Sequence, residues 1–293
     1  MASLRDIRRR IKSVKNTAQI TKAMQMVAAS KMRKAQEAAV AGRPFVRLFN
    51  RVLTSIIEKG GELQHPLLTT KNPDARPAVL VITTDKGLCG PLNTNLLREV
   101  GQLPPQTTFI SVGRKGRQFL SRTSRDLLAD FNVSEKVAFA EAKQISKFIL
   151  DKFLAGELAS YSIYYSRFKN TLVQTPFKLD LLPMTGLTRL EIDSGLDSGA
   201  NPAETAPVLE YQFEPAPSAV LDYLLPQYIH FLTYQAILSS RASEHSARMV
   251  AMKNATDNAK QLVKDLTLEY NKARQAGITN EILEIASAQM AMN

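Results

Sequence analysis

The feature that most constrains the fold is a long segment without helix breakers at each end of the sequence. No Gly or Pro occurs before Gly42, and the fifty consecutive residues 227–276 also lack both. Fifty helical residues extend about 75 Å, which is too long for a compact domain of this size. Helices of such length need a neighbour to pack against, so we expect the two ends to pack on each other.

Apolar and small residues in both segments recur at alternating spacings of three and four, which is the heptad pattern of a coiled coil. In the first segment only Gln25 interrupts this seam. Many seam positions are Ala, Thr or Met rather than Leu, so the helices should approach closely. The pattern predicts an antiparallel coiled coil, with two separate surface helices on a globular body as the alternative. The seam positions are Leu4, Ile7, Ile11, Val14, Ala18, Thr21, Ala28, Met32, Ala35 and Ala39, then Met249, Met252, Thr256, Ala259, Val263, Leu266, Tyr270 and Ala273.

Positive charge is concentrated in the N-terminal segment. The net charge is +11, and residues 1–40 carry +8 of it, with ten Lys and Arg against only Asp6 and Glu37. An Arg-rich amphipathic start is also typical of transit peptides. A basic helix that leads into heptads allows a second alternative, a nucleic-acid-binding protein. Against that alternative, the seam begins at Leu4, inside the basic run, and the Leu-rich positions of a zipper are missing.

Between the two ends, short apolar strands alternate with helices. We expect strands at 78–83, 107–112, 160–165 and 172–182, and helices at 92–100, 115–120 and 140–154. This order predicts a Rossmann-like α/β domain with a largely parallel sheet. The Gly- and Pro-containing residues 186–207 are predicted to form a flexible surface excursion. The fold class is therefore α/β with a long coiled coil, divided into an N-terminal helix (1–58), a central domain (75–207) and a C-terminal helix (208–293).

The loops of the central domain contain no phosphate-binding motif. Residues 84–93, TDKGLCGPLN, follow the first strand, but they have neither the P-loop spacing nor the dinucleotide-binding spacing of glycines. Gly113 and Gly116 form only a G-x-x-G pair, so we expect tight turns here. An enzyme with a nucleotide-binding domain is thus a disfavoured alternative.

The residues that carry chemistry in other proteins are scattered here. Cys89 is the single cysteine and has no partner histidine, so we expect a structural thiol in a reducing compartment. His65, His230 and His245 lack metal-ligand spacing, and His230 and His245 fall on predicted helix. No stretch approaches 18 apolar residues, so we expect no membrane span. We also expect no catalytic residue, no metal and no cofactor.

Four stretches resemble the gamma subunit of F-type ATP synthases. They are residues 1–36 (MASLRDIRRRIKSVKNTAQITKAMQMVAASKMRKAQ), 84–93 (TDKGLCGPLN), 214–229 (EPAPSAVLDYLLPQYI) and 244–285 (EHSARMV to ITNEILEI). The resemblance covers the whole chain and starts at residue 2, so the basic helix is expected to belong to the mature protein. With only Cys89, the chain resembles the bacterial type without the cysteine-containing regulatory insertion. At residues 286–289 it departs from the Gly-Ala pair that is usual in the family.

The resemblance implies a central rotor shaft that is not an enzyme on its own. Such a shaft couples proton flow through the membrane c-ring to ATP synthesis or hydrolysis on the beta subunits. The implied partners are the alpha and beta subunits of the catalytic head, the epsilon subunit and the c-ring, with no nucleic acid. The implied location is peripheral, on the cytoplasmic face of the bacterial inner membrane.

The resemblance also implies two groups of beta-subunit contacts. In the N-terminal helix, Met24 would face the acidic lever segment of beta, within the positive charge of Lys22, Lys31, Arg33 and Lys34. In the C-terminal helix the contact residues would be Arg274, Gln275, Thr279 and Glu281. From the residues alone, we expect the seam to end after Ala273, Gly277 to interrupt the pattern, and the partner helix either to have ended near Gly42 by then or to be pointing away.

Overall fold

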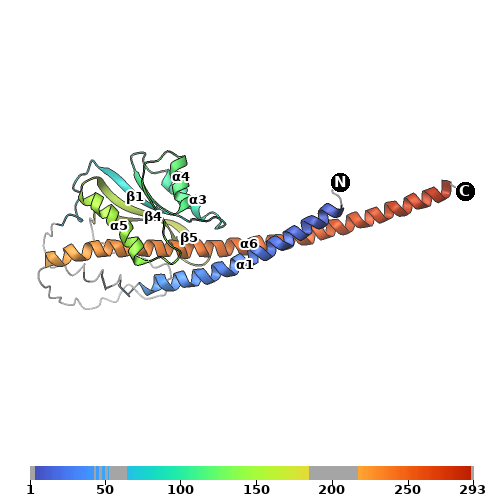
Figure 1. Cartoon of the computed structure of the whole chain (residues 1–293), viewed down its shortest axis with the longest axis horizontal. Helices are drawn as coiled ribbons and strands as arrows, with labels where there is room; N and C mark the ends of the chain where they lie inside the picture. The colour runs from blue at the N-terminus through green and yellow to red at the C-terminus, as the bar shows by residue number, and fades with distance from the viewer. Residues whose placement is uncertain are drawn as a thin grey trace. The chain divides into compact units, whose positions relative to one another are not determined.

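The computed structural model describes residues 4–42, 44–45, 48–49, 52, 65–184 and 217–291. These residues form long helices and a five-stranded sheet with its own helices (Figure 1). The chain divides into two compact units: Met1–Ala28 with Met249–Asn293, and Ala29–Arg248. Helices α1 (Leu4–Ala41) and α6 (Pro217–Ala291) each contribute residues to both units.

The two long helices confirm the prediction made from the absence of helix breakers. Helix α1 has 38 residues and α6 has 75. Helix α6 contains Pro226 and also runs on through Gly277, so the expected interruption at Gly277 is wrong. A single glycine costs only about 1 kcal/mol relative to alanine in a helix interior, which the good helix formers around it can offset.

In the first unit the two helices pack through the predicted seam. The seam residues Ile7, Ala28, Met252, Thr256 and Ala259 are buried. The other seam residues of this unit are half-buried, except Leu4 at the helix end, which is 37% exposed. The antiparallel coiled coil is therefore confirmed, and small side chains let its helices lie close together.

One polar pair fixes the register of this coiled coil. The hydroxyl oxygens of Thr21 and Thr256 lie 2.8 Å apart. Counting outward from this pair in an antiparallel arrangement, Ala273 lies level with Leu4, where α1 begins. Helix α6 therefore loses its neighbour at the start of α1 and continues beyond it (Figure 1). The expectation that the partner helix would end there near Gly42 is wrong, because Gly42 lies at the opposite end of α1.

The central domain is built on a sheet with strand order β3-β2-β1-β4-β5. Its strands are β1 (Arg76–Ile82), β2 (Thr108–Val112), β3 (Leu127–Phe131), β4 (Leu158–Phe168) and β5 (Gln174–Leu182). Strands β3, β2, β1 and β4 are parallel and β5 is antiparallel to β4, which confirms a largely parallel sheet. Strand β3 was not expected from the sequence. It adds to the edge of the sheet by pairing with β2.

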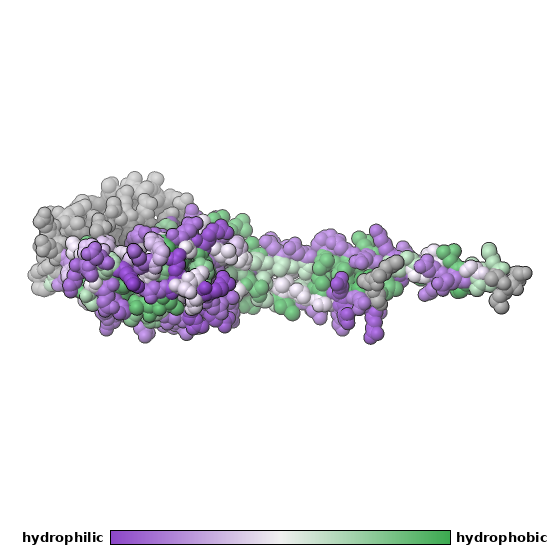
Figure 2. All heavy atoms as spheres, turned by 90° about the horizontal axis from the view of Figure 1, so that it is seen from above, coloured by the Kyte–Doolittle hydropathy of each residue, from purple (hydrophilic) through white to green (hydrophobic). Residues whose placement is uncertain are grey.

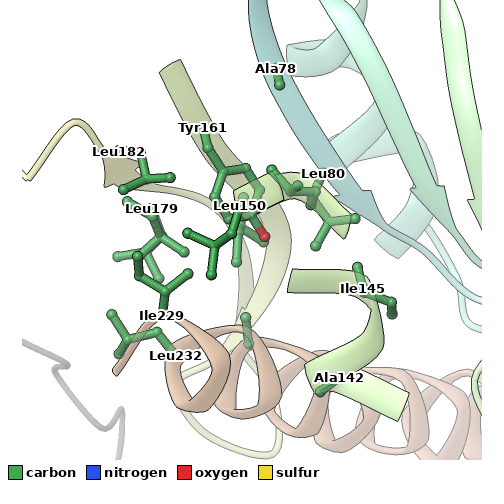
Figure 3. Close-up of a cluster of buried hydrophobic side chains, with 14 of the residues drawn as sticks. Ala78, Leu80, Ala142, Ile145, Leu150, Tyr161, Leu179, Leu182, Ile229 and Leu232 are labelled. Atoms are coloured by element: carbon green, nitrogen blue, oxygen red, sulfur yellow. The ribbon is translucent and has the colours of Figure 1, made fainter. Parts of the chain in front are cut away.

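Helices cover both faces of the sheet (Figure 1). Helices α3 (Leu92–Gly101) and α4 (Arg114–Arg122) pack on the face that receives Val79 and Val81 of β1. Helix α5 (Phe139–Leu154) and the first part of α6 pack on the other face, which receives Ala78 and Leu80. Successive side chains of β1 point to opposite faces of the sheet, so this strand contributes to two separate hydrophobic cores. Figure 3 shows the larger core, with Ala142, Ile145 and Leu150 of α5, Tyr161 of β4, Leu179 and Leu182 of β5, and Ile229 and Leu232 of α6.

Some expectations fall outside the described residues. The predicted surface excursion at 186–207 lies in the part of the chain that the structure does not describe. The division into parts 1–58, 75–207 and 208–293 stays a prediction.

Candidate partner-contact surface

The positive charge of the N-terminal segment lies on the outside of α1. All Lys and Arg side chains of this helix are exposed except Lys31, which is half-buried. Three apolar side chains, Ile20, Met26 and Val27, are also more than half exposed. Figure 2 shows such apolar residues as separate green patches between purple hydrophilic ones along the coiled coil. Single exposed apolar side chains are normal on protein surfaces, so the feature of α1 that suits contact with other chains is its exposed Lys and Arg side chains.

The four predicted contact residues of α1 have different surroundings. Lys22 is exposed and its ammonium group donates to Gln25 Oε1 at 3.3 Å. Met24 is half-buried, beside the seam position at Gln25. Its flexible side chain is adaptable, so it can contact a partner from the edge of the seam.

Lys31 and Arg33 already have acidic neighbours within this chain. Lys31 forms an ion pair with Glu135, in the loop before α5, and this bond holds the pKa of the Glu135 carboxyl below its usual value. Arg33 Nε lies 3.1 Å from Glu37 Oε1, one helical turn away. A beta-subunit carboxylate would have to share or replace these partners.

The four predicted contact residues of α6 lie on the part of the helix that has passed the start of α1. Arg274, Gln275, Thr279 and Glu281 are all exposed. Arg274 and Glu281 are seven residues apart and so share one helix face, while Gln275 and Thr279 lie on the adjacent face. The Thr279 hydroxyl donates to Gln275 O at 2.9 Å, so its oxygen remains an acceptor. The arrangement offers a guanidinium, an amide and a carboxylate to a partner.

The same end of α6 also exposes large apolar side chains, which sequence reasoning did not select. Ile282, Leu283 and Ile285 are each at least 60% exposed, and Met290 is 82% exposed. Their signal was present in the sequence, since apolar residues continue after the seam has ended. A helix end with this many exposed apolar groups is typical of a segment that other chains enclose.

A buried charge cluster on α6 was also missed. Arg241, Glu244 and Arg248 are 13%, 7% and 12% exposed, respectively. Glu244 Oε2 accepts from Arg241 at 2.9 Å and Glu244 Oε1 accepts from Arg248 at 2.8 Å. The spacings of three and four residues allow contact between these side chains on a helix, but a charged helix face is usually solvated, so the sequence did not single them out. Burial therefore came from the domain that packs over them.

Cys89 and the histidines have structural surroundings. Cys89 is buried, and burial raises the pKa of its thiol. His230 Nδ1 lies 2.7 Å from Ser146 Oγ of α5, in a contact between two buried groups. Burial lowers the pKa of His230 to about 4, and Lys143 and Lys147 act in the same direction. His230 is thus a packing residue that stays neutral above that pH.

The glycines of the G-x-x-G pair make a tight strand-to-helix turn, as expected. Gly113 has a φ of +94° and precedes α4. Gly116 N donates to Thr83 Oγ1 at 2.8 Å, next to the end of β1. These glycines let α4 approach the sheet closely.

Helix α6 occupies the edge of the sheet where related architectures hold ligands. In open α/β sheets, ligands bind beyond the carboxyl ends of the strands, where the strand order changes direction. Here that place lies between β1 and β4. Ser246 Oγ donates to Thr171 O at 2.7 Å, and Arg248 reaches Gly87 O at 3.4 Å. Both carbonyls belong to the loops that leave these two strands.

Two features are absent from the part of the chain that the structure describes. Among the described residues, no three His, Cys, Asp or Glu side chains gather as metal ligands would. Likewise, none of the described helices has a stretch long and apolar enough to cross a membrane.

Together these features define a class of protein: an interaction subunit with a long helical pair and an α/β domain. The sequence profile of the ATP synthase family matches residues 3–292. An ATP synthase gamma chain from Opitutus terrae is 54% identical over 295 residues, which is 99% of each chain. One from Methylacidiphilum infernorum is 52% identical over 298 residues, which is 100% of each chain. The chain therefore belongs to the ATP synthase gamma-chain family.

Solved structures show the same fold. A chain in the mitochondrial ATP synthase of Euglena gracilis, in an assembly of OSCP, F1 and c-ring, gives a TM-score of 0.67 at 24% identity. That likeness covers 99% of this chain and 94% of the Euglena chain. A chain of the central stalk and c-ring of the Tetrahymena thermophila enzyme gives a TM-score of 0.58 at 27% identity, over 80% of this chain and 99% of that one. As a gamma chain, the protein is a rotor subunit of ATP synthase.

Proposed function

We propose that the coiled coil of the first unit is the part of the rotor shaft that turns within a ring of three alpha and three beta subunits. The observation that carries this proposal is the free end of α6, which passes the start of α1 and exposes both apolar and charged side chains. A thin seam of Ala, Thr and Met keeps the helical pair narrow enough for such a ring. Membership in the gamma-chain family favours this function over nucleic-acid binding.

The α/β domain and its helices connect this shaft to the epsilon subunit and the c-ring. The rotor then couples proton flow through the c-ring to ATP synthesis or hydrolysis on the beta subunits. Its place is peripheral, on the cytoplasmic face of the bacterial inner membrane. The relatives from Opitutus and Methylacidiphilum, two bacteria, support this location.

The partner contacts proposed for beta are those on α1 and α6. Lys22, Met24, Lys31 and Arg33 would meet the acidic lever segment of beta, and Arg274, Gln275, Thr279 and Glu281 would meet a beta loop. The intrachain partners of Lys31 and Arg33 make their contacts exchangeable, which suits a surface that meets three beta subunits in turn. A solvent-exposed ion pair such as Arg33–Glu37 stabilises by only about 0–1 kcal/mol, so replacing Glu37 by a beta-subunit carboxylate costs little free energy.

The chain should not be catalytic by itself. Purified without alpha and beta subunits, it should hydrolyse no ATP. Added to alpha and beta subunits, it should give a complex whose ATP hydrolysis drives proton pumping once the membrane sector is bound. Hydrolysis rates and proton uptake into vesicles measure both properties. Turnover by the chain after rigorous removal of beta subunits, or a complex that never pumps, would contradict the proposal.

Replacing Met24 with lysine should reduce coupling. Met24→Lys adds a positive charge where α1 would face an acidic segment, so one rotor angle gains an ionic contact that the others lack. We expect ATP hydrolysis to be retained while ATP-driven proton pumping per ATP falls. Met26→Lys is the matched control, because it adds the same charge at an exposed position two residues away on a different helix face. Equal coupling in the Met24→Lys and parent complexes would refute the contact assigned to Met24.

A further inference from the structure

The side chains of the buried charge cluster on α6 form ion pairs with one another and also contact the α/β domain. Arg241 binds Glu244 through Nη1 and the α/β domain through Nη2. Arg248 binds Glu244 through Nη2 and the domain through Nη2 and Nε. Arg241 Nη2 donates to Val133 O at 3.0 Å and lies 3.4 Å from Asp85 Oδ2. Glu244 thus holds two arginines that each bridge from α6 to the domain. We call Arg241, Glu244 and Arg248 the Glu244 clamp.

The clamp reaches two loops at the carboxyl edge of the sheet. Val133 follows β3, while Asp85 and Gly87 follow β1. Arg248 donates to Gly87 O from Nε and Nη2, both at 3.4 Å. Asp85 is itself fixed, because its Oδ1 accepts from the backbone N–H of Arg114 at the start of α4 at 3.1 Å. The clamp therefore binds α6 to the rigid part of the domain at separate points.

The physical character of the clamp differs from that of the rest of the interface. Most of the contact between α6 and the sheet is apolar, as at Ile229 and Leu232. Hydrophobic contact is not directional, whereas charge-assisted hydrogen bonds fix angle as well as distance. Buried ion clusters often add little net stability compared with apolar residues, and a well-attested use of them is to fix geometry. The clamp is therefore suited to resist rotation of α6 against the domain.

We propose that Glu244 is a positioning residue that fixes the angle of the α/β domain on α6 and so carries torque between them. This inference rests on the rotor function proposed above. In a rotor, torque must pass between the helices and the α/β domain. If α6 rotated against the domain, part of that torque would not be transmitted. Glu244 acts through Arg241 and Arg248 and touches no reacting group.

The test is a Glu244→Gln variant in the complete, membrane-bound complex. Glutamine keeps the shape of the side chain, but it removes the negative charge and turns an NH₂ group toward one of the two guanidinium groups. We expect the complex to assemble and hydrolyse ATP, while protons pumped per ATP fall severalfold. Arg125→Ala is the control, because Arg125 instead binds the carbonyls of Gly101 and Leu103 at the end of α3. That variant weakens the domain without changing the clamp, so its coupling should match the parent.

Each outcome decides the inference. Unchanged protons per ATP in Glu244→Gln, in a parent complex that pumps, would overturn the clamp and leave the rotor function intact. Equal loss of coupling in Arg125→Ala would reduce Glu244 to a structural role. A parent complex that does not pump would instead count against the rotor function. If Glu244→Gln fails to assemble, Arg248→Gln keeps the Arg241–Glu244 pair and should show the same loss of coupling, and full coupling there would refute the clamp.

Discussion

Replacing Arg274 with alanine should slow steady-state ATP turnover of the assembled complex by about ten- to a hundredfold. The reason lies in the position of Arg274, which is exposed on α6 just beyond the level at which α1 begins. Among the described residues no other helix lies beside this part of α6, so its guanidinium can meet a partner, and a charge-assisted hydrogen bond contributes about 1.5–3 kcal/mol. A contact made at one rotor angle and broken at the next changes the barrier by that amount, which corresponds to the expected factor in rate.

Gln275→Ala should have a similar direction of effect, because the amide lies next to the guanidinium on the same free helix. Lys272→Ala is the matched control, since it removes an exposed positive charge two residues before Arg274. The measurement is ATP turnover in complexes with the same subunit content. If Lys272→Ala slows turnover as much as Arg274→Ala, charge alone explains the effect. If Arg274→Ala and Gln275→Ala turn over like the parent, both residues are solvated helix surface.

Replacing Gly113 with alanine should destabilise the central domain by about 3–5 kcal/mol. The residue has a φ of +94°, which an alanine rarely adopts. A Cβ at this position would lie 2.3 Å from Thr83 O, a backbone atom that cannot move away cheaply. Thr83 N also donates to Val112 O at 2.8 Å, so displacing Thr83 would disturb the join between β1 and β2.

The measurement for Gly113→Ala is urea unfolding of the purified chain, followed by a signal from the central domain. Gly87→Ala is the control, because Gly87 lies in a nearby loop and a Cβ there would meet nothing within 4 Å. Its free energy of unfolding should stay within about 0.5 kcal/mol of the parent. A Gly113→Ala chain as stable as the parent would show that the turn can relax around the added methyl group.

Periodic features were predictable from the sequence, and features set by tertiary contact were not. The seam from Met249 to Ala273 was predicted correctly, because the spacing of three and four follows directly from helix geometry. Strand β3 was missed, because LLADF is short, has no β-branched residue and contains Ala129 and Asp130. It is a strand because its backbone pairs with β2, a contact that the local sequence does not contain.

In the candidate partner-contact surface, too, features that follow from helix periodicity were predictable, and features that depend on tertiary contacts were not. The exposed positions of Arg274, Gln275, Thr279 and Glu281 agree with the expected end of the seam. Their roles toward beta remain predictions. The expectation about Gly277 failed because a local breaker was given more weight than the helix formers around it. The Glu244 clamp was invisible because the sequence shows charge but not the loops that cover it.

The placement of α6 at the ligand edge of the sheet has a consequence for how the domain holds its shaft. A doubly wound domain normally grips a diffusible molecule at this edge, and that molecule leaves at a rate set by its affinity. Here the gripped element is part of the same polypeptide, so its effective concentration stays high whatever the strength of each contact. A contact at Ser246 or Arg248 that breaks under load can therefore re-form before the helix leaves. The domain therefore keeps its hold on α6 even when single contacts break, because the helix that lies at its ligand edge is covalently part of the same chain.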